Sequence, residues 1–200
     1  MKRIKEKKER SLGTKLFIKA ERCSGPKCVM IRRPYRPGVH GHARRRGGIS
    51  EFGRQLQEKQ KIQITYGLSG RQMRNLFKGS LGKTLVLLER RLDRVVFLLG
   101  FAPSTRVARQ VVSHGHIVVN GRKVTIPSYS VKIGDVISIR PESRRAKIFE
   151  ELGMKLKQYE PPVWLKLDKE NLKGECKENP KPEDINAPFD INLVGQFYAR

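Results

Sequence analysis

The sequence lacks any long apolar run. Its longest apolar stretches, such as Thr84–Leu88 and Val95–Leu99, fall far short of the roughly 20 residues that a membrane-spanning helix needs. The first ten residues, Met1–Arg10, are basic and no apolar stretch follows them, so we expect no secretory signal. With three cysteines in 200 residues, the chain is a poor candidate for a disulfide framework and fits a reducing compartment.

Acidic residues are also scarce. There are 19 Asp and Glu residues against 43 Lys and Arg, which gives a formal net charge of +24. Successive blocks of fifty residues carry +13, +6, +6 and −1, so the excess is greatest at the N-terminus. So much charge of one sign destabilises a compact fold unless a polyanion neutralises it. Nucleic acid is therefore the expected partner, and an anionic membrane surface is the alternative.

The motifs of common enzymes are missing as well. The sequence contains no G-x-S-x-G, no Walker A loop, no dinucleotide-binding fingerprint and no H-E-x-x-H, each of which positions a catalytic or phosphate-binding group. Hydrophobic residues make up only 38% of the chain, but they are clustered and periodic. We therefore expect a folded core with basic extensions and not a disordered chain.

Residues 1–50 show little periodicity. Glycine and proline interrupt them at Gly25-Pro26 and Pro37-Gly38, and Arg32-Arg33 and Arg44–Arg46 add blocks of charge. This composition predicts an extended basic arm with one short helix.

A helical domain is predicted over residues 51–88. Ser50 can cap a helix that runs toward Tyr66. Ser69 and Gln72 have the spacing of a capping box at the start of a second helix, which glycines at 79 and 82 would end. Apolar residues at helical spacing in 186–200 predict a C-terminal helix that completes this domain.

The clearest pattern lies in residues 89–156, which we expect to form a small α/β domain of two helices followed by a hairpin-rich sheet. Four apolar residues make one helix face: Leu92, Val95, Val96 and Leu99. A second helix begins after Ser104 or Thr105. Asn120-Gly121 then predicts a tight hairpin between strands 117–119 and 123–126, because both residues accept a positive φ. A further strand is expected at 136–139.

The rest of the chain gives weaker signals. Residues 144–156 are predicted to be helical and basic at their start, and residues 163–167 to form a strand. The polar, proline-containing stretch 173–188 is predicted to be mostly loop. Residues 157–185 are thus expected to be a strand and loop extension of the α/β domain.

The basic residues of the α/β domain form a candidate RNA-binding surface. Arginine offers planar bidentate contacts to phosphate, and a glycine between two histidines would let the backbone approach a phosphate closely. The alternative is a solvated basic helix face. The candidates are Arg91, Arg94, Arg106, Arg109, His114, Gly115, His116, Asn120 and Lys123.

The run Arg91–Arg140 closely resembles the RNA-binding domain that is named after small-subunit ribosomal protein four. Four further segments are similar to the bacterial-type family of that ribosomal protein. They are PYRPGVHGHARRR (34–46), the stretch 50–77, PPVWLKLD (161–168) and FDINLVGQFYAR (189–200). The resemblance covers nearly the whole chain in order.

This resemblance implies a function and a set of partners. It implies a non-catalytic constituent of the small subunit of a cytoplasmic ribosome, which binds the 5′ domain of the small-subunit rRNA and nucleates assembly. It also implies a contribution to translational accuracy, with mRNA at the entry channel and ribosomal protein five as neighbours. Arg44, Arg45 and Arg46 would contact mRNA or rRNA. Other rRNA-binding candidates are Arg32, Arg33, Arg36, Lys59, Arg71 and Arg74.

The chain departs from the family at its zinc knuckle. Many family members bind zinc through two cysteine pairs near the N-terminus. Here Cys23 and Cys28 match the second pair, and Glu6 and Glu9 align with the first. A closed structural zinc site needs four Cys or His ligands, so we expect no bound metal and no cofactor, with both thiols packed as small apolar groups. The connector 78–83 is also shorter than is usual in the family.

Two other interpretations remain at this point. An RNA-modifying enzyme could carry the same RNA-binding domain, and Asp93 would then be the carboxylate to examine, although pairing with neighbouring arginines explains it better. A polybasic membrane-surface protein would need a basic amphipathic helix, whereas the charges here are interleaved with Gly and Pro. We expect no membrane partner.

Overall fold

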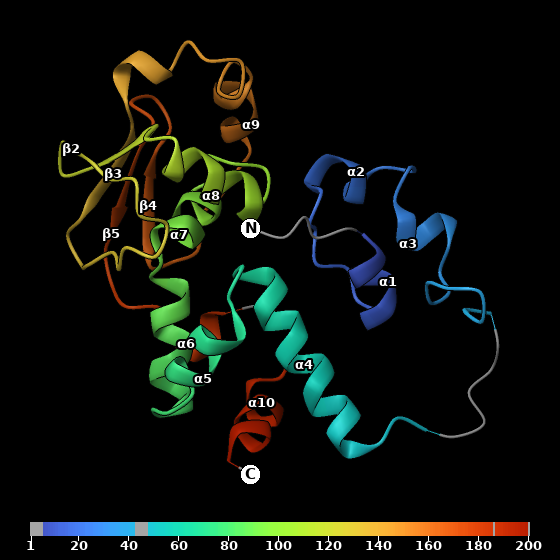
Figure 1. Cartoon of the computed structure of the whole chain (residues 1–200). Coiled ribbons are helices and arrows are strands. Elements are labelled where there is room, and N and C mark those ends of the chain that lie inside the picture. The colour runs from blue at the N-terminus through green and yellow to red at the C-terminus, as the bar shows by residue number, and fades with distance from the viewer. Residues whose placement is uncertain (1–5, 43–47, 186, 200) are drawn as a thin grey trace. The chain divides into compact units, whose positions relative to one another are not determined.

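The computed structural model of the chain, shown in Figure 1, describes residues 6–42, 48–185 and 187–199. It is an α+β protein, as predicted. The chain forms two compact units. The helical unit comprises Met1–Thr84 together with Asn186–Arg200, and the sheet unit comprises Leu85–Ile185.

The first part of the helical unit contains three short helices, α1 (Lys7–Leu12), α2 (Ala20–Ser24) and α3 (Val29–Arg32). Leu12, Leu16 and Ile18 form a small buried cluster, against which Ile64 packs. Our expectation of one short helix was therefore too low. Glu9 and Cys23 are also buried in this segment. A search for hydrophobic periodicity does not find such polar and isolated residues.

Two further helices of this unit begin at the caps that the sequence predicted. The Ser50 hydroxyl accepts a hydrogen bond from the Gly53 amide at 3.2 Å at the start of α4 (Glu51–Thr65). Ser69 and Gln72 form a reciprocal capping box, at 3.3 and 2.9 Å, ahead of α5 (Gly70–Leu76). Both predictions are confirmed.

The C-terminal helix α10 (Ile191–Tyr198) lies beside α4 (Figure 1). Aromatic pairs join them and their neighbours, with ring centroids 5.6 Å apart for Phe52 and Phe197 and 5.3 Å apart for Phe77 and Tyr198. These aromatic pairs supply apolar contacts within the helical unit.

Helix α6 (Leu81–Glu89) carries the boundary between the two units. Gly82, which we expected to end a helix, lies in the first turn of this one. The Thr84 hydroxyl donates to the carbonyls of Leu76 and Ser80, at 2.9 and 3.1 Å, and Leu88 is fully buried. Burial of this helix outweighs the modest cost of one glycine.

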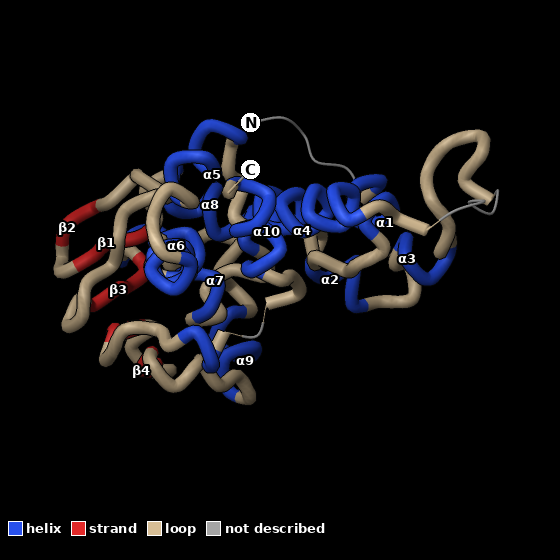
Figure 2. Tube along the Cα trace, turned by 90° about the horizontal axis from the view of Figure 1, so that it is seen from below, coloured by secondary structure: helices blue, strands red, loops and turns tan. Residues whose placement is uncertain are grey.

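The sheet unit places α7 (Leu92–Leu98) and α8 (Thr105–Ser113) against a five-stranded antiparallel sheet (Figure 2). The strand order is β2-β1-β3-β5-β4. The strands are β1 (Ile117–Val119), β2 (Arg122–Lys123), β3 (Val136–Ile139), β4 (Leu165–Asp168) and β5 (Lys173–Cys176). The remaining elements are two 3₁₀ turns, η1 (Pro141–Ser143) and η2 (Pro182–Asp184), and α9 (Leu152–Lys157).

Alternation along the strands fixes the buried face of the sheet. Ile117 pairs with Ile139, and Val119 pairs with Ile137. All four belong to the core that also contains the predicted apolar face of α7. The intervening Val118 and Ser138 are half-exposed on the other face, as the two-residue period of a strand requires.

Three predictions in the sheet unit were wrong. Residues 173–176 are not loop but strand β5, which pairs with both β3 and β4. Residues 144–156 are turns followed by the short α9. The second hairpin strand is only Arg122–Lys123. Within the residues that the structure describes, no helix is long and apolar enough to cross a membrane.

Candidate nucleic-acid interface

Helix α8 presents two of the predicted RNA-binding arginines. Its first turn is closed by Ser104, whose hydroxyl accepts a hydrogen bond from the Val107 amide at 3.3 Å. Ala108, Val111 and Val112 are buried, which fixes the rotation of the helix. Arg106 and Arg109 therefore lie toward its outer side, and both are half-exposed.

Arg91, one of the predicted RNA-binding residues, does not lie on the surface. Its side chain is nine-tenths buried, and its guanidinium donates to both oxygens of Asp93, at 3.0 and 2.7 Å. Arg109 of α8 lies 3.7 Å from the same carboxylate. Burial raises the pKa of Asp93, and its arginine partners oppose that rise. The expectation that Asp93 pairs with neighbouring arginines is confirmed.

Arg94 also has partners inside the protein. Its Nε lies 3.0 Å from a carboxylate oxygen of the buried Glu89, and its guanidinium stacks over the Phe97 ring at 5.2 Å. Arg90 donates to the Val131 carbonyl at 2.7 Å. The three arginines near the start of α7 therefore all make contacts inside the sheet unit.

The turn 114–116 differs from its predicted role at one residue. Gly115 has φ +76° and is buried, and a methyl group there would collide with the Lys123 side chain. The end of the Lys123 side chain, its Cε and Nζ atoms, occupies the space that this glycine leaves open. His114 is exposed, whereas His116 hydrogen-bonds through Nδ1 with the Ser143 hydroxyl at 2.9 Å.

The hairpin tip has the predicted turn. Asn120 and Gly121 have φ of +50° and +78°, as a tight two-residue hairpin requires. The Asn120 amide donates to Asp135 at 2.8 Å and accepts from the Val136 amide at 2.9 Å. Both ends of this side chain are therefore used inside the fold, and its contact with RNA stays a prediction. Arg122 and Lys123 remain exposed at the tip.

Sequence reasoning missed a basic loop next to this surface. Arg144, Arg145 and Lys147 are exposed in the segment after β3. The hydrogen bond between His116 and Ser143 joins that segment to the end of α8, and Arg144 donates to the Asn171 carbonyl at 3.1 Å. The signal was present in the sequence RPESRRAK (140–147), but we assigned it to a helix.

The helical unit carries the remaining predicted residues. Arg32, Arg33, Arg71 and Arg74 are exposed, and Arg36 is half-buried. The Lys59 ammonium lies over the rings of Phe197 and Tyr198, at 4.2 and 5.1 Å. Burial, and then the charge of Arg74, lowers the pKa of Lys59. Lys59 thus joins α4 to α10. Arg44, Arg45 and Arg46 lie outside the described residues.

Comparison with known proteins agrees with the resemblance in the sequence. Residues 1–94 match the family described as the ribosomal protein S4/S9 N-terminal domain, and residues 90–137 match the S4 domain. Small ribosomal subunit protein uS4 of Thermus thermophilus is 47% identical over 94% of this chain and 93% of its own length. The proteins of the same name from Halothermothrix orenii and Gloeobacter violaceus are each 46% identical, over 94% and 96% of this chain and 93% and 94% of their own.

Proposed function

The chain belongs to the family of small ribosomal subunit protein uS4, and we propose that it is a structural, non-catalytic rRNA-binding protein of the small ribosomal subunit. The observation that carries this proposal is a group of exposed and half-exposed basic residues on the sheet unit. We name it the basic surface, and it consists of Arg106, Arg109, His114, Arg122, Lys123, Arg144, Arg145 and Lys147.

The chemistry of this surface suits folded RNA. A-form helices expose phosphates and 2′-hydroxyls, while the base edges of their deep groove are inaccessible to side chains. Arginine and lysine on a rigid helix, a hairpin tip and an adjoining loop can contact phosphates of more than one RNA strand, and each contact releases counterions. Such a surface holds crowded RNA helices together, which is the task of a protein that acts early in subunit assembly.

The enzymatic alternative finds no support in the position of Asp93. A catalytic carboxylate must reach its substrate, but Asp93 is 5% exposed and is bonded to Arg91. The family is one of ribosomal structural proteins, and we assign no catalytic step to this chain.

The finer partners are proposals from the family resemblance. They are the 5′ domain of the small-subunit rRNA, mRNA at the entry channel and ribosomal protein five, in the small subunit of a cytoplasmic ribosome. Nucleation of assembly and a contribution to translational accuracy belong to the same proposal. Arg32, Arg33 and the exposed residues of α5, Arg71 and Arg74, are the contacts we propose in the helical unit.

Chemical probing of free small-subunit rRNA tests this function. We expect the purified protein alone to protect one compact set of nucleotides in the 5′ domain. Replacing Arg106, Arg122 and Arg145 with glutamine should remove part of that protection while Trp164 fluorescence stays unchanged, because Trp164 is buried in the sheet unit. Protection that is spread evenly over the RNA, or absent, would contradict the proposal.

A further inference from the structure

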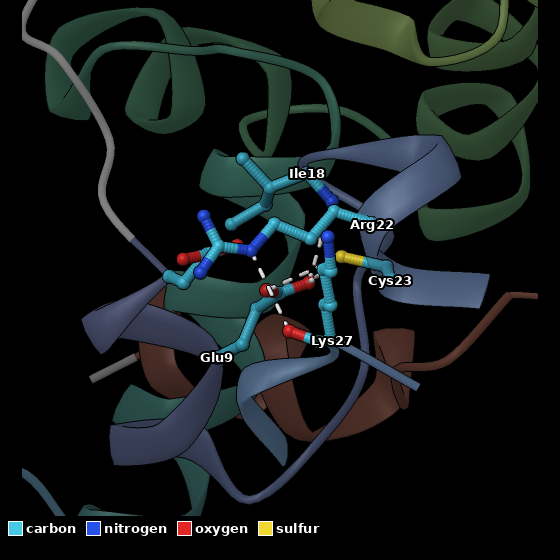
Figure 3. Close-up of polar contacts among 6 residues, drawn as sticks. Glu9, Ile18, Arg22, Cys23 and Lys27 are labelled. Atoms are coloured by element: carbon cyan, nitrogen blue, oxygen red, sulfur yellow. Dashed lines mark hydrogen bonds and ion pairs between the residues drawn. The ribbon is translucent and has the colours of Figure 1, made fainter. Parts of the chain in front are cut away.

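A buried carboxylate lies at the centre of the segment 6–33, which we name the knuckle. Glu9 of α1 is only 2% exposed. One of its oxygens accepts hydrogen bonds from the amides of Leu16 and Ile18, at 2.9 and 3.3 Å. The Cys23 thiol lies 3.9 and 4.0 Å from its two oxygens and donates toward them (Figure 3). A single side chain thus joins α1, the following loop and α2.

The loop that Glu9 binds directs two backbone amides, those of Leu16 and Ile18, at one carboxylate oxygen. Phe17, between the two amide donors, has φ +51°, a left-handed conformation that is uncommon for a bulky residue. Alternation of right- and left-handed residues turns successive amides toward one point and creates a concave anion-binding nest. Phe17 itself is exposed, so burial of its ring does not account for this conformation, which agrees with a loop that is shaped around the carboxylate.

Peripheral contacts complete the knuckle. Glu6 pairs with Arg22 at 3.4 Å, and Arg22 also donates to the Lys27 carbonyl at 3.5 Å (Figure 3). Cys23 and Cys28 are 3% and 2% exposed, which agrees with their predicted packing. These contacts lie around Glu9, which is the most deeply buried charged group among the described residues of this segment.

The donor set does not fit a structural zinc ion. A closed structural site takes four Cys or His ligands, with each cysteine bound as the thiolate, whereas this segment combines two cysteines with two glutamates. Burial, together with the negative charge of Glu9, also raises the pKa of the Cys23 thiol. The Glu9 oxygens already accept hydrogen bonds from backbone amides. Among the residues that the structure describes, no three His, Cys, Asp or Glu side chains are grouped as metal ligands.

We propose that the Glu9 carboxylate takes the place of a metal ion in this chain, closing the knuckle and positioning the arm for RNA. The neighbouring Arg10 extends the effect. It donates to the carbonyls of Tyr35 and Arg36, at 2.9 and 3.3 Å, and stacks over the Tyr35 ring, which in turn stacks on His42. Neighbouring residues of α1, Glu9 and Arg10, therefore hold both the stretch 16–23, which includes the start of α2, and the segment 35–42. The RNA part of this inference rests on the proposed function.

Hydrogen exchange of the full-length protein tests the inference without RNA. The amides of Leu16 and Ile18 should exchange about tenfold faster or more in Glu9→Ala, because both lose a buried charged acceptor. Glu9→Gln keeps an oxygen acceptor without the charge and should fall between Ala and the parent. Glu6→Gln, which removes only the peripheral pair with Arg22, is the matched control. Unchanged exchange of both amides in Glu9→Ala would overturn the proposal.

Metal analysis and RNA-binding measurements are the two further tests of this proposal. We expect no stoichiometric zinc in the parent protein and the same Leu16 and Ile18 exchange with and without a strong chelator. One tightly held zinc per chain, or faster exchange after chelation, would overturn the proposal even if Glu9→Ala fails to fold. With rRNA, Glu9→Gln should bind about tenfold more weakly than Glu6→Gln. If the parent protein itself does not bind rRNA, the proposed function fails, while the exchange result still decides the role of Glu9.

Discussion

Arg91 and Asp93 form a bidentate ion pair at the start of α7, with nitrogen-to-oxygen distances of 3.0 and 2.7 Å. Arg109 of α8 adds a second cation 3.7 Å from the same carboxylate. Breaking a buried ion pair leaves an uncompensated charge in the interior. Charged groups thus connect α7 to α8, and two of them, Arg91 and Arg109, are residues that the sequence predicted to bind RNA.

This ion pair predicts a large loss of stability in Asp93→Ala. We expect the free energy of unfolding of the sheet unit to fall by about 3–5 kcal/mol, because Arg91 stays buried without its partner. Urea titration followed by Trp164 fluorescence measures it, since Trp164 is the sole tryptophan and is buried in this unit. Glu150→Ala, at an exposed position, is the control. A loss similar to that of the control would show that the pair is not structural.

Two neighbouring residues of the hairpin should separate stability from binding. Asn120→Ala removes the bonds to Asp135 and Val136 and places alanine at φ +50°, so we expect a loss of about 1–3 kcal/mol. Arg122→Gln, at the exposed tip, should weaken rRNA binding and leave the unfolding transition unchanged. Urea titrations and binding measurements on both variants test this. The reverse pattern would mean that Asn120 is the RNA contact.

The basic loop after β3 should contribute directly to RNA affinity. Replacing Arg144, Arg145 and Lys147 with glutamine should lower the affinity and reduce the slope of log affinity against log salt by about 2–3, because each phosphate contact releases roughly one counterion. Lys177→Gln with Lys181→Gln is the control. Lys177 follows the end of β5, which pairs with the first residues of β3. The basic loop follows the last residues of β3, so the two sets lie at opposite ends of that strand. Equal effects of the two sets would show a non-specific charge effect.

The cysteines should be slow to react in the folded protein. Burial raises the pKa of Cys23 and of Cys176, so both thiols stay protonated at neutral pH, and the thiolate is the reactive form. Alkylation should therefore be slow in native protein, rise only as the pH passes above the usual thiol range, and become fast in urea. Rapid alkylation of the native protein at neutral pH would place a thiol at the surface.

Local signals in the sequence predicted much of this fold. Caps at Ser50 and Ser69 and the Asn120-Gly121 turn depend on neighbours within a few residues, so a single sequence reveals them. Strand β5, with the sequence KGEC, carries no apolar alternation. It is a strand because β3 and β4 pair with it. A side chain at Gly174 would collide with Leu99, the residue that follows α7. Such long-range requirements leave no periodic signal.

The candidate site shows the same division. Composition predicted a basic surface, and three of the predicted residues, Arg106, Arg109 and Lys123, are exposed or half-exposed members of it. Composition could not show which arginines pair with a carboxylate, because the pairs of Asp93 and Glu89 depend on how the helices pack. The loop 144–147 follows Ser143, which hydrogen-bonds with His116, a residue 27 positions away in the sequence.

Binding of the full-length protein to the 5′ domain of small-subunit rRNA, measured over a range of salt concentrations, tests the central claim most directly. An unrelated structured RNA of equal length is the reference. The account predicts tighter binding to the 5′ domain at every salt concentration, together with a steep negative slope of log affinity against log salt. Equal affinity for both RNAs, or an affinity that does not change with salt, would contradict it.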